Sequence, residues 1–403
     1  MVDSISGSGP KTRCINLCES SRIRDSRTRP PQTSSKNNTV PTNEKRKLQR
    51  TLIRWYRQSA RDLPWRNTND PYAIWVSEIM LQQTRIETAT PYYERFLTRF
   101  PTVHKLAAAR PDTVLKHWEG LGYYSRALNM HKAAKLIVSN FDGRLPPQRK
   151  TLLELPGIGP YTAGAISSIA FGAREPIVDT NVARVLCRLY QIETDPKTTQ
   201  TRKQLWAIAS DLVPRTSPGR FNQALMELGA LICRARSPLC RDCCLSSLCR
   251  AGRAGLQDTL PKTSPTHRTI RKTVVVGIIH RRGKILIDRR PPRGLLGGLW
   301  EFPGGKQEPG ETLQRALHRE LREEMEIEVD IKRHIAAVNH AYTHFSIRLH
   351  AFLCTLRSGR PQPKTCTAWK WVLPKNLGRY AFPTATRKVI AIWKDAGIED
   401  LES

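Results

Sequence analysis

The segment Leu155–Tyr161 reads Leu-Pro-Gly-Ile-Gly-Pro-Tyr and precedes an apolar stretch. Gly157 and Gly159 permit a tight turn with outward-facing main-chain N–H groups, and Pro160 suits the first turn of a following helix. The N-terminus of such a helix attracts a phosphate. Asp179 follows after a helix-length apolar segment. A phosphate-binding turn beside a carboxylate indicates chemistry on DNA, although a purely structural turn between helices has the same pattern.

A second carboxylate, Glu78, lies in a helical segment that is otherwise apolar around it. Its neighbours on that face are Ile74, Trp75, Ile79 and Leu81. An apolar setting disfavours the charged carboxylate and raises its pKa, so Glu78 is expected to be a general acid. The structural alternatives are an exposed helix glutamate at Glu78 and a helix cap at Asp179.

Cysteines cluster in one short segment. Five of the ten lie between Cys233 and Cys249. Cys233, Cys240, Cys243 and Cys249 form a compact set, with Cys244 as a spare. Four thiolates hold zinc or an iron–sulfur cluster. Zinc sites commonly pair two Cys-x-x-Cys knuckles and only one such pair occurs here, so we expect a [4Fe–4S] cluster in a reducing, intracellular compartment.

The composition points to a nucleic-acid partner. The chain has 403 residues, 39% of them hydrophobic, and a formal net charge of +31 that is spread along its length. This size predicts two domains, and this charge predicts a polyanionic partner. No apolar run approaches the roughly 20 residues that span a bilayer. DNA is therefore favoured over a membrane, and a merely soluble basic protein is the other alternative.

The chain changes texture along its length. Residues 1–44 are rich in Ser, Thr, Arg and Pro and are expected to form a disordered basic tail. Residues 45–250 carry apolar residues at helical spacing, punctuated by Gly and Pro, and predict an all-α domain. The clearest helical segments are 48–56, 74–84, 91–100, 112–118 and 125–138.

A second domain is expected after a linker over 251–270. Residues 273–279 and 284–287 are rich in Val and Ile and predict paired strands, while 312–326 predicts a helix. Residues 271–400 are therefore expected to form an α+β domain.

Five ordered motifs make the chain resemble the MutY-type adenine DNA glycosylases, members of the helix-hairpin-helix iron–sulfur glycosylase superfamily. The resemblance runs from about residue 48 into the C-terminal region. It implies base excision repair, acting on adenine opposite 8-oxoguanine or guanine in double-stranded DNA. The motifs are Trp75–Thr84, Gly120–Arg126, the hairpin Leu155–Tyr161, Val178–Asn181 and the cysteine set.

The resemblance assigns roles to four residues. Cleavage of an N-glycosidic bond needs a proton for the departing base and negative charge near the sugar. The resemblance implies Glu78 as the acid toward adenine N7 and Asp179 as the stabiliser or transient nucleophile at the sugar. It implies that Tyr161 and Asn181 order the sugar and the attacking water, although each could be only a packed side chain.

Tyr161 also separates this chain from endonuclease III-like relatives. These relatives place a lysine nucleophile at that position of the hairpin, and a tyrosine cannot form the imine needed for strand cleavage. We therefore expect a monofunctional glycosylase, with an endonuclease III-like glycosylase/lyase as the alternative.

DNA contacts are expected from further motif residues. Extrusion of a base from the duplex requires side chains that fill the gap, and the resemblance implies Gln83 and Tyr123. Gly157 and Gly159 would approach a phosphate with their main chain. The arginines among the cysteines are expected to contact phosphates. They are Arg234, Arg236, Arg241 and Arg250.

The C-terminal domain resembles the Nudix hydrolase box over Gly305–Glu324. Glu320, Glu323 and Glu324 lie at i, i+3 and i+4 of one helix, where three carboxylates would need a cation such as Mg²⁺. Glu326 departs from the pattern, which has glycine there, and this weakens the hydrolase reading. Two hypotheses stand for this domain: recognition of 8-oxoguanine, and a Mg²⁺-dependent 8-oxo-dGTP pyrophosphatase.

The recognition hypothesis has its own motif. Tyr342, Thr343 and His344 occupy the positions of the Phe-Ser-His loop with which the family reads 8-oxoguanine, and Thr343 keeps the hydroxyl. We expect a monomer that acts with DNA in the bacterial cytoplasm or nucleoid, or in a eukaryotic nucleus or mitochondrion.

Overall fold

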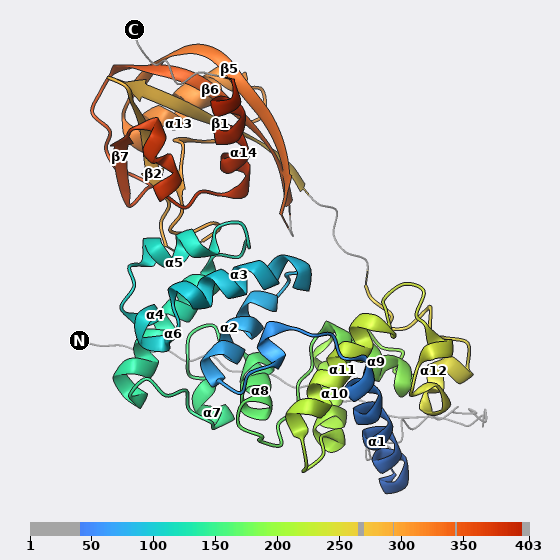
Figure 1. Ribbon diagram of the computed structural model, residues 1–403. Helices are drawn as coiled ribbons and strands as arrows, with labels where there is room; N and C mark the ends of the chain where they lie inside the picture. The colour runs from blue at the N-terminus through green and yellow to red at the C-terminus, as the bar shows by residue number, and fades with distance from the viewer. Residues whose placement is uncertain (1–40, 265–269, 293, 343–344, 397–403) are drawn as a thin grey trace, which may run out of the picture. The chain divides into compact units, whose positions relative to one another are not determined.

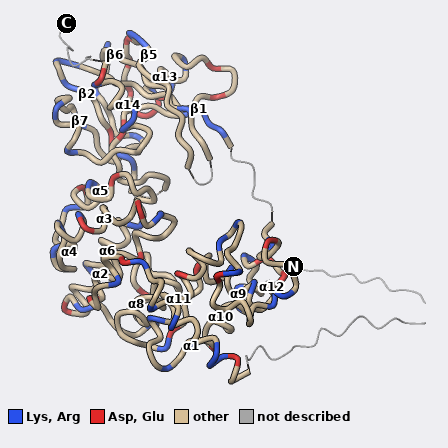
Figure 2. Tube along the Cα trace, turned by 45° about the vertical axis from the view of Figure 1, so that its right-hand side comes forward, with Lys and Arg blue, Asp and Glu red and all other residues tan. Residues whose placement is uncertain are grey.

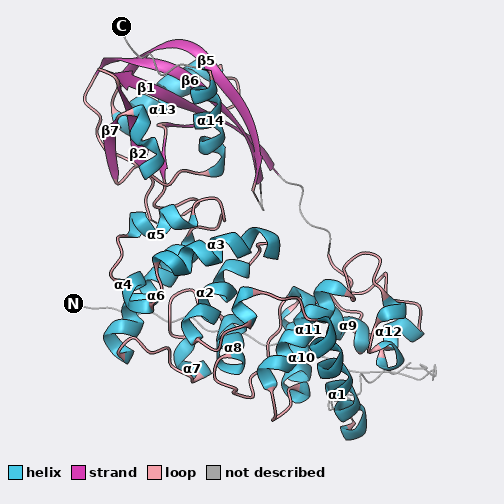
Figure 3. Cartoon of the chain, in the orientation of Figure 1, coloured by secondary structure: helices cyan, strands magenta, loops and turns pink. Residues whose placement is uncertain are grey.

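A computed structural model describes residues 41–264, 270–292, 294–342 and 345–396. The first range is the helical part of the chain, and the other three form the sheet part (Figures 1 and 3). No strand occurs within residues 41–264, and the sheet part is α+β, so the predicted fold classes are confirmed. Among the described residues no helix combines the length and the apolarity needed to cross a bilayer.

The helical part consists of short helices separated by Gly and Pro, as the sequence predicts. Its helix α1 begins at Thr42, inside the segment that the sequence assigned to the tail. The helices are α1 Thr42–Ser59, η1 Pro64–Arg66, α2 Pro71–Leu81, α3 Ile86–Arg99, α4 Val103–Ala107, α5 Pro111–Trp118, α6 Ser125–Phe141, α7 Arg149–Leu152, α8 Pro160–Ile169, α9 Thr180–Leu189, α10 Thr199–Leu212, α11 Pro218–Leu231, η2 Cys240–Asp242, η3 Ser246–Leu248 and α12 Arg250–Arg253.

Helix α2 is the central helix of this part. Asp70 caps it by accepting hydrogen bonds from the N–H groups of Tyr72 and Ala73, and Pro71 occupies its first position. Every residue from Tyr72 to Met80 is buried, which is typical of a core helix that is apolar all round. The helix ends at Leu81, before the predicted end at Thr84, because Gln83 adopts a left-handed backbone with φ of 59°.

Two hydrophobic clusters hold the helical part together. One contains side chains of α2, α3, α5 and α6, among them the fully buried Trp75, Phe96 and Trp118. The other joins α1, α9, α10 and α11 around Leu52 and Phe221. Helices α2 and α8 pack together, as do α9 and α11. The catalytic candidates come from α2, α8 and α9, so their geometry depends on both clusters.

The sheet part contains one seven-stranded sheet with the order β3-β2-β1-β6-β5, while β4 pairs with β1 and β7 with β2. Strands β1 and β6 run parallel, and the other pairs are antiparallel. Arg282 and Gly283, with φ of 48° and 66°, form the two-residue turn between β1 and β2. The strands are β1 Ile270–Arg281, β2 Lys284–Arg289, β3 Trp300–Glu301, β4 Gly304–Lys306, β5 Glu328–Ala341, β6 Phe345–Ser358 and β7 Ala368–Val372.

Two α-helices, α13 (Leu313–Met325) and α14 (Thr384–Asp395), contribute to separate hydrophobic clusters of the sheet part. A short helix η4 (Pro374–Arg379) precedes α14. Helix α13 carries the Nudix-like carboxylates. It ends at Met325, and the following cap residue, Glu326, has a φ of 54°, the left-handed conformation that glycine adopts most readily. The helix end therefore keeps its ordinary cap geometry despite the substituted glutamate.

Candidate active site

One cavity of about 170 Å³ in the helical part is lined by all four residues predicted to be catalytic. Glu78 comes from α2, Tyr161 from the first turn of α8, and Asp179 and Asn181 from the start of α9. Residues separated by up to 103 positions in the chain thus share one small space. The cavity is the candidate active site.

Glu78 is buried, with 5% of its surface exposed. Burial raises the pKa of Glu78 to about 7, while the hydrogen bond from Tyr161 lowers it and the charge of Asp179 raises it further. The Tyr161 hydroxyl donates to Glu78 Oε2 at 2.7 Å. The alternative of an exposed helix glutamate is therefore wrong. A carboxyl group that titrates near neutrality can give up a proton at the working pH of an enzyme.

Tyr161 lies between the acid and helix α11. Its hydroxyl contacts Glu78 and also the sulfur of Met226, at 3.2 Å. Burial raises the pKa of Tyr161 well above its usual value, and the neighbouring carboxylates Glu78 and Asp179 act in the same direction. Tyr161 therefore stays protonated and keeps its hydroxyl hydrogen for the bond to Glu78.

Asp179 caps α9 and lines the cavity at the same time. Its Oδ1 accepts from the Val182 N–H at 2.6 Å, and its Oδ2 accepts from the Asn181 side-chain amide at 3.0 Å. Burial raises the pKa of Asp179, and these two hydrogen bonds oppose the rise. Capping and catalysis are therefore compatible roles for one carboxylate.

Asn181 is held from the other side by Arg184. The Arg184 guanidinium donates to Asn181 Oδ1 at 2.8 Å and to the carbonyls of Gly229 and Cys233 at 2.6 and 2.8 Å. Asn181 thus has a fixed orientation, with its amide nitrogen directed at Asp179. It lies where it could order a sugar or a water beside that carboxylate.

Sequence reasoning missed an ion-pair network in the cavity wall. Glu227 of α11 is buried, and Arg61 and Arg66 contact both of its oxygens at distances of 2.6 to 3.0 Å. Burial alone would raise the pKa of Glu227, but the two guanidinium groups outweigh it and hold the pKa at about 2. Glu227 is therefore ionised while Glu78 is poised near neutrality. No short motif links Glu227 to Arg61 and Arg66, which lie more than 160 positions before it in the chain.

The two residues expected to enter DNA lie outside this cavity lining. Gln83 follows α2 and Tyr123 precedes α6, and both are exposed at turns. Both have left-handed backbones, with φ of 59° and 46°, a region that non-glycine residues rarely adopt.

The hairpin glycines differ from each other. Gly157 has φ of 81°, and a Cβ there would lie 2.8 Å from the Asn129 side chain, so glycine is required by this fold. Gly159 has an extended backbone that any residue adopts, and a Cβ there would meet nothing within 4 Å. Gly159 leaves the N-terminus of α8 open, which suits the close approach of a phosphate.

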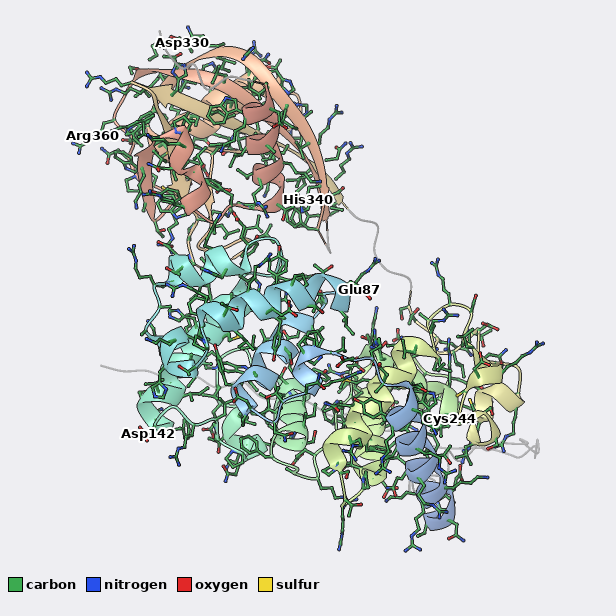
Figure 4. All side chains as sticks on the ribbon, viewed as in Figure 1. Glu87, Asp142, Cys244, Asp330, His340 and Arg360 are labelled. Carbon is green, nitrogen blue, oxygen red and sulfur yellow. The ribbon has the colours of Figure 1, made fainter. Side chains whose placement is uncertain are left out.

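The four predicted cluster ligands also share a cavity. Cys233, Cys240, Cys243 and Cys249 line a space of about 290 Å³, and Cys244 is absent from that lining. Figure 4 marks Cys244 in the segment beside α12. The buried Arg188 guanidinium lies 3.3 Å from the Cys233 sulfur, and the Gly252 N–H donates to the Cys249 sulfur at 3.3 Å. Such donors favour the anionic thiolate form in which cysteines bind a cluster.

Lys and Arg residues occur along both parts of the chain, as the blue segments of the trace in Figure 2 show. The four arginines of the cysteine segment, Arg234, Arg236, Arg241 and Arg250, are all exposed. Their positions leave them accessible to phosphates.

The Nudix-like carboxylates do not act as one set of three. Glu320 and Glu324 line a cavity of about 550 Å³ in the sheet part together with Glu301. Arg319 forms ion pairs with Glu311, Glu320 and Glu323, at distances of 2.7 to 3.2 Å. Within the described residues, neither these carboxylates nor the four cysteines form a group of three or more side chains placed to hold a metal ion.

Burial dominates the electrostatics of this cavity. It raises the pKa of Glu324 to about 7, and the charges of Glu320 and Glu301 add to the rise. Burial likewise raises the pKa of Asp288 and of Glu301. Arg290 contacts Glu301 Oε1 at 2.7 Å.

Part of the loop that is predicted to recognise 8-oxoguanine lies within the described residues. Tyr342 lines the same cavity and stacks on Phe345, with ring centroids 4.8 Å apart and an interplanar angle of 24°. His340, marked in Figure 4, makes an edge contact with Tyr342 at 4.6 Å. Thr343 and His344 lie outside the described residues.

Comparison with known proteins agrees with these two parts. Residues 76–210 match the HhH-GPD superfamily of base excision DNA repair proteins, and residues 274–391 match the NUDIX domain. The adenine DNA glycosylase of Homo sapiens is 36% identical over 400 residues, covering 85% of this chain and 73% of the human protein.

Two further relatives carry the same name. The adenine DNA glycosylase of Rattus norvegicus is 36% identical over 402 residues, covering 86% of this chain and 78% of that protein. The adenine DNA glycosylase of Buchnera aphidicola from Acyrthosiphon pisum is 31% identical over 344 residues, covering 85% of this chain and 96% of that protein. The chain therefore belongs to the adenine DNA glycosylases, base excision repair enzymes of the MutY type with an HhH-GPD region and a C-terminal NUDIX domain.

Proposed function

We propose that this enzyme hydrolyses the N-glycosidic bond of adenine paired with 8-oxoguanine or guanine in double-stranded DNA and leaves an abasic site. The observation that supports this most strongly is the shared cavity of Glu78, Tyr161 and Asp179, in which a buried glutamate has its pKa raised to about 7.

In this proposal Glu78 protonates adenine N7 through the oxygen that does not accept from Tyr161. The bond from C1′ to N9 then breaks, and its electron pair leaves with the base. Asp179 stabilises the positive charge that develops on the sugar. Water then adds to C1′, and the proton that this water loses is taken up by one of the two carboxylates.

The walls of the cavity offer both partners that an adenine needs. The base has an exocyclic amine that donates and ring nitrogens that accept, and Glu227, Arg61 and Arg66 supply an acceptor and donors beside Glu78. Because their ion pairs fix all three side chains, these groups are oriented before the base arrives.

The reaction stops at base removal in this proposal. Tyr161 occupies the hairpin position of the lysine in endonuclease III-like enzymes, and no lysine of the described residues lines the cavity. Without an amine nucleophile there is no imine to the sugar, and therefore no strand cleavage.

Cys233, Cys240, Cys243 and Cys249 would hold a [4Fe–4S] cluster. The support is the cavity that they line, with the Arg188 guanidinium and the Gly252 N–H directed at two of the sulfurs. In this proposal the cluster shapes the arginine-bearing loop and takes no part in bond cleavage. Figure 2 shows basic residues in this region, near α12.

The sheet part would recognise 8-oxoguanine opposite the target adenine. The stacked pair of Tyr342 and Phe345 offers an aromatic surface in a cavity of the size of a nucleobase site. The competing proposal, a Mg²⁺-dependent pyrophosphatase, draws support from Glu320 and Glu324 in that cavity. Recognition is favoured because Arg319 already forms ion pairs with Glu311, Glu320 and Glu323 and so occupies oxygens that a cation would need.

The test is an end-labelled duplex with a single adenine opposite 8-oxoguanine. We expect free adenine and an alkali-labile site, with strand scission only after alkali. Scission without alkali, trapped as a covalent adduct by borohydride, would contradict the monofunctional reaction. The Glu78→Gln variant serves as the control for adenine release.

A further inference from the structure

Arg126, in the first turn of α6, joins the two turns that carry Gln83 and Tyr123. Both turns hold a non-glycine residue in the left-handed region, at φ of 59° and 46°. Such backbones are costly and persist only where the surroundings fix them. The contacts of Arg126 identify what fixes them here.

The first set of contacts closes the end of helix α2. The Arg126 guanidinium donates to the carbonyls of Ile79, Met80 and Gln82 at 2.8, 3.0 and 2.5 Å, and to Thr84 Oγ1 at 3.3 Å. The last carbonyls of a helix have no partner within the helix. Arg126 supplies that partner and also contacts the residues on both sides of Gln83.

The second set of contacts holds the turn before α6. The same guanidinium donates to the carbonyls of Leu121, Gly122 and Tyr123 at 3.3, 3.2 and 3.4 Å. It also lies over the rings of Trp118 and Tyr123, 5.3 and 5.5 Å from their centroids. One planar group therefore contacts both turns and an aromatic ring that emerges from one of them.

The acceptors of Arg126 are all uncharged. Six are backbone carbonyls and one is a hydroxyl. Burial lowers the pKa of Arg126 to about 10, which shows the cost of keeping a charge there. The planar guanidinium group of arginine presents several N–H donors in fixed directions, which the ammonium group of lysine cannot do. A site with several acceptors therefore needs arginine even where burial disfavours its charge.

We propose that Arg126 is a positioning residue for base extrusion, which locks the turns of Gln83 and Tyr123 into one arrangement so that both side chains can enter the base stack together. This inference rests on the proposed roles of Gln83 and Tyr123. Without the lock each turn would have to be ordered separately on the DNA, and that ordering would reduce the extruded population.

The test compares two substrates under single-turnover conditions at saturating enzyme. In the first, adenine is paired opposite 8-oxoguanine. In the second, adenine lies opposite an abasic-site analogue, where no base pair has to be broken. Extrusion costs least for an unpaired base, so only the first substrate depends strongly on it.

For Arg126→Lys we expect the rate on the paired substrate to fall by roughly tenfold or more, and the rate on the unpaired substrate to fall by less than about threefold. Fluorescence of 2-aminopurine in place of adenine should report the same loss of extrusion. The matched control is Arg95→Lys on α3, a guanidinium that lies 4.5 Å from the Tyr92 ring. We expect wild-type rates on both substrates for this control.

Other outcomes overturn the proposal. An equal fall on both substrates means that Arg126 supports the catalytic pocket in general, and no fall on either means that the lock is dispensable. The rate on the unpaired substrate and the thermal unfolding midpoint show whether a variant has folded. Gln83→Ala and Tyr123→Ala test the underlying roles: if neither slows the paired substrate while the wild type releases adenine, the loop roles fail and the proposal fails with them, whereas the glycosylase reaction stands.

Discussion

The buried Glu78 of the helical part and the half-buried Glu324 of the sheet part have nearly the same acidity and different surroundings. Burial raises the pKa of Glu78 and of Glu324 to about 7 in both cases. Glu78 accepts from a protonated tyrosine and shares its cavity with two other carboxylates, Asp179 and the arginine-paired Glu227. Glu324 lies among further carboxylates, and Arg290 and Arg319 pair with Glu301 and Glu320 beside it.

A raised pKa alone therefore does not make a glutamate a catalytic acid. Burial favours the protonated acid in both places, and in the helical part Asp179 lines the same cavity, where the proposed reaction places the sugar. In the sheet part Arg290 and Arg319 form ion pairs with Glu301 and Glu320, and we propose recognition there instead of hydrolysis.

The largest predicted difference is between the matched changes of the two glutamates. Glu78→Gln removes the only proposed proton donor and is expected to lower adenine release by about 10³-fold or more. Glu324→Gln, the matched change in the sheet part, should alter the single-turnover rate by less than about threefold. Quenched-flow assays at saturating enzyme measure both. Equal losses for the two variants would break the comparison.

A smaller loss is expected for Asp179→Asn. The asparagine keeps a cap oxygen for the Val182 N–H but removes the negative charge beside the sugar, so we expect about a 10²-fold slower reaction with little change in the unfolding midpoint. A large fall of the midpoint with an unchanged rate would show that Asp179 acts only as a cap.

The aromatic pair of the sheet part should affect the choice of opposite base. Tyr342→Ala removes the ring that stacks on Phe345 and is expected to reduce the preference for 8-oxoguanine over guanine by roughly tenfold. Parallel rates on the two duplexes give this ratio. An unchanged ratio would show that 8-oxoguanine is recognised outside this cavity.

The smallest effect is expected from divalent cations. Because Arg319 already forms ion pairs with Glu320 and Glu323, chelation of Mg²⁺ should change adenine release by less than about twofold. The full chain with Mg²⁺ and 8-oxo-dGTP should give no pyrophosphate. Steady pyrophosphate formation that is lost in Glu320→Gln would establish the pyrophosphatase instead.

The sequence predicts the local features of this molecule well and its long-range contacts poorly. The apolar neighbours of Glu78 are enough to predict a raised pKa, and Pro160 predicts the start of α8. Gly157 meets the predicted need for a special backbone, whereas Gly159 does not. The end of α2 was predicted too late because the left-handed Gln83 has no signal of its own.

The ion pairs of Glu227 with Arg61 and Arg66 escaped prediction for a physical reason. They join α11 to the segment between α1 and α2, and nothing in the spacing of residues reports which distant helices meet. The same holds for Arg126, whose motif was evident but whose acceptors depend on two turns packing together. Sequence motifs identify the reacting groups, and the fold identifies the groups that orient them.

The central claim is that the protonated form of Glu78 controls the reaction, and the pH dependence of the single-turnover rate tests it most directly. Glu78 is active while protonated, so the rate should be high below its pKa and fall as pH rises through about 7. Tyr161→Phe removes a hydrogen bond that lowers this pKa, so the falling limb should move to higher pH. In Glu324→Gln the limb should stay in place. A limb that is absent from the wild type, or that moves with Glu324 and not with Tyr161, would contradict the account.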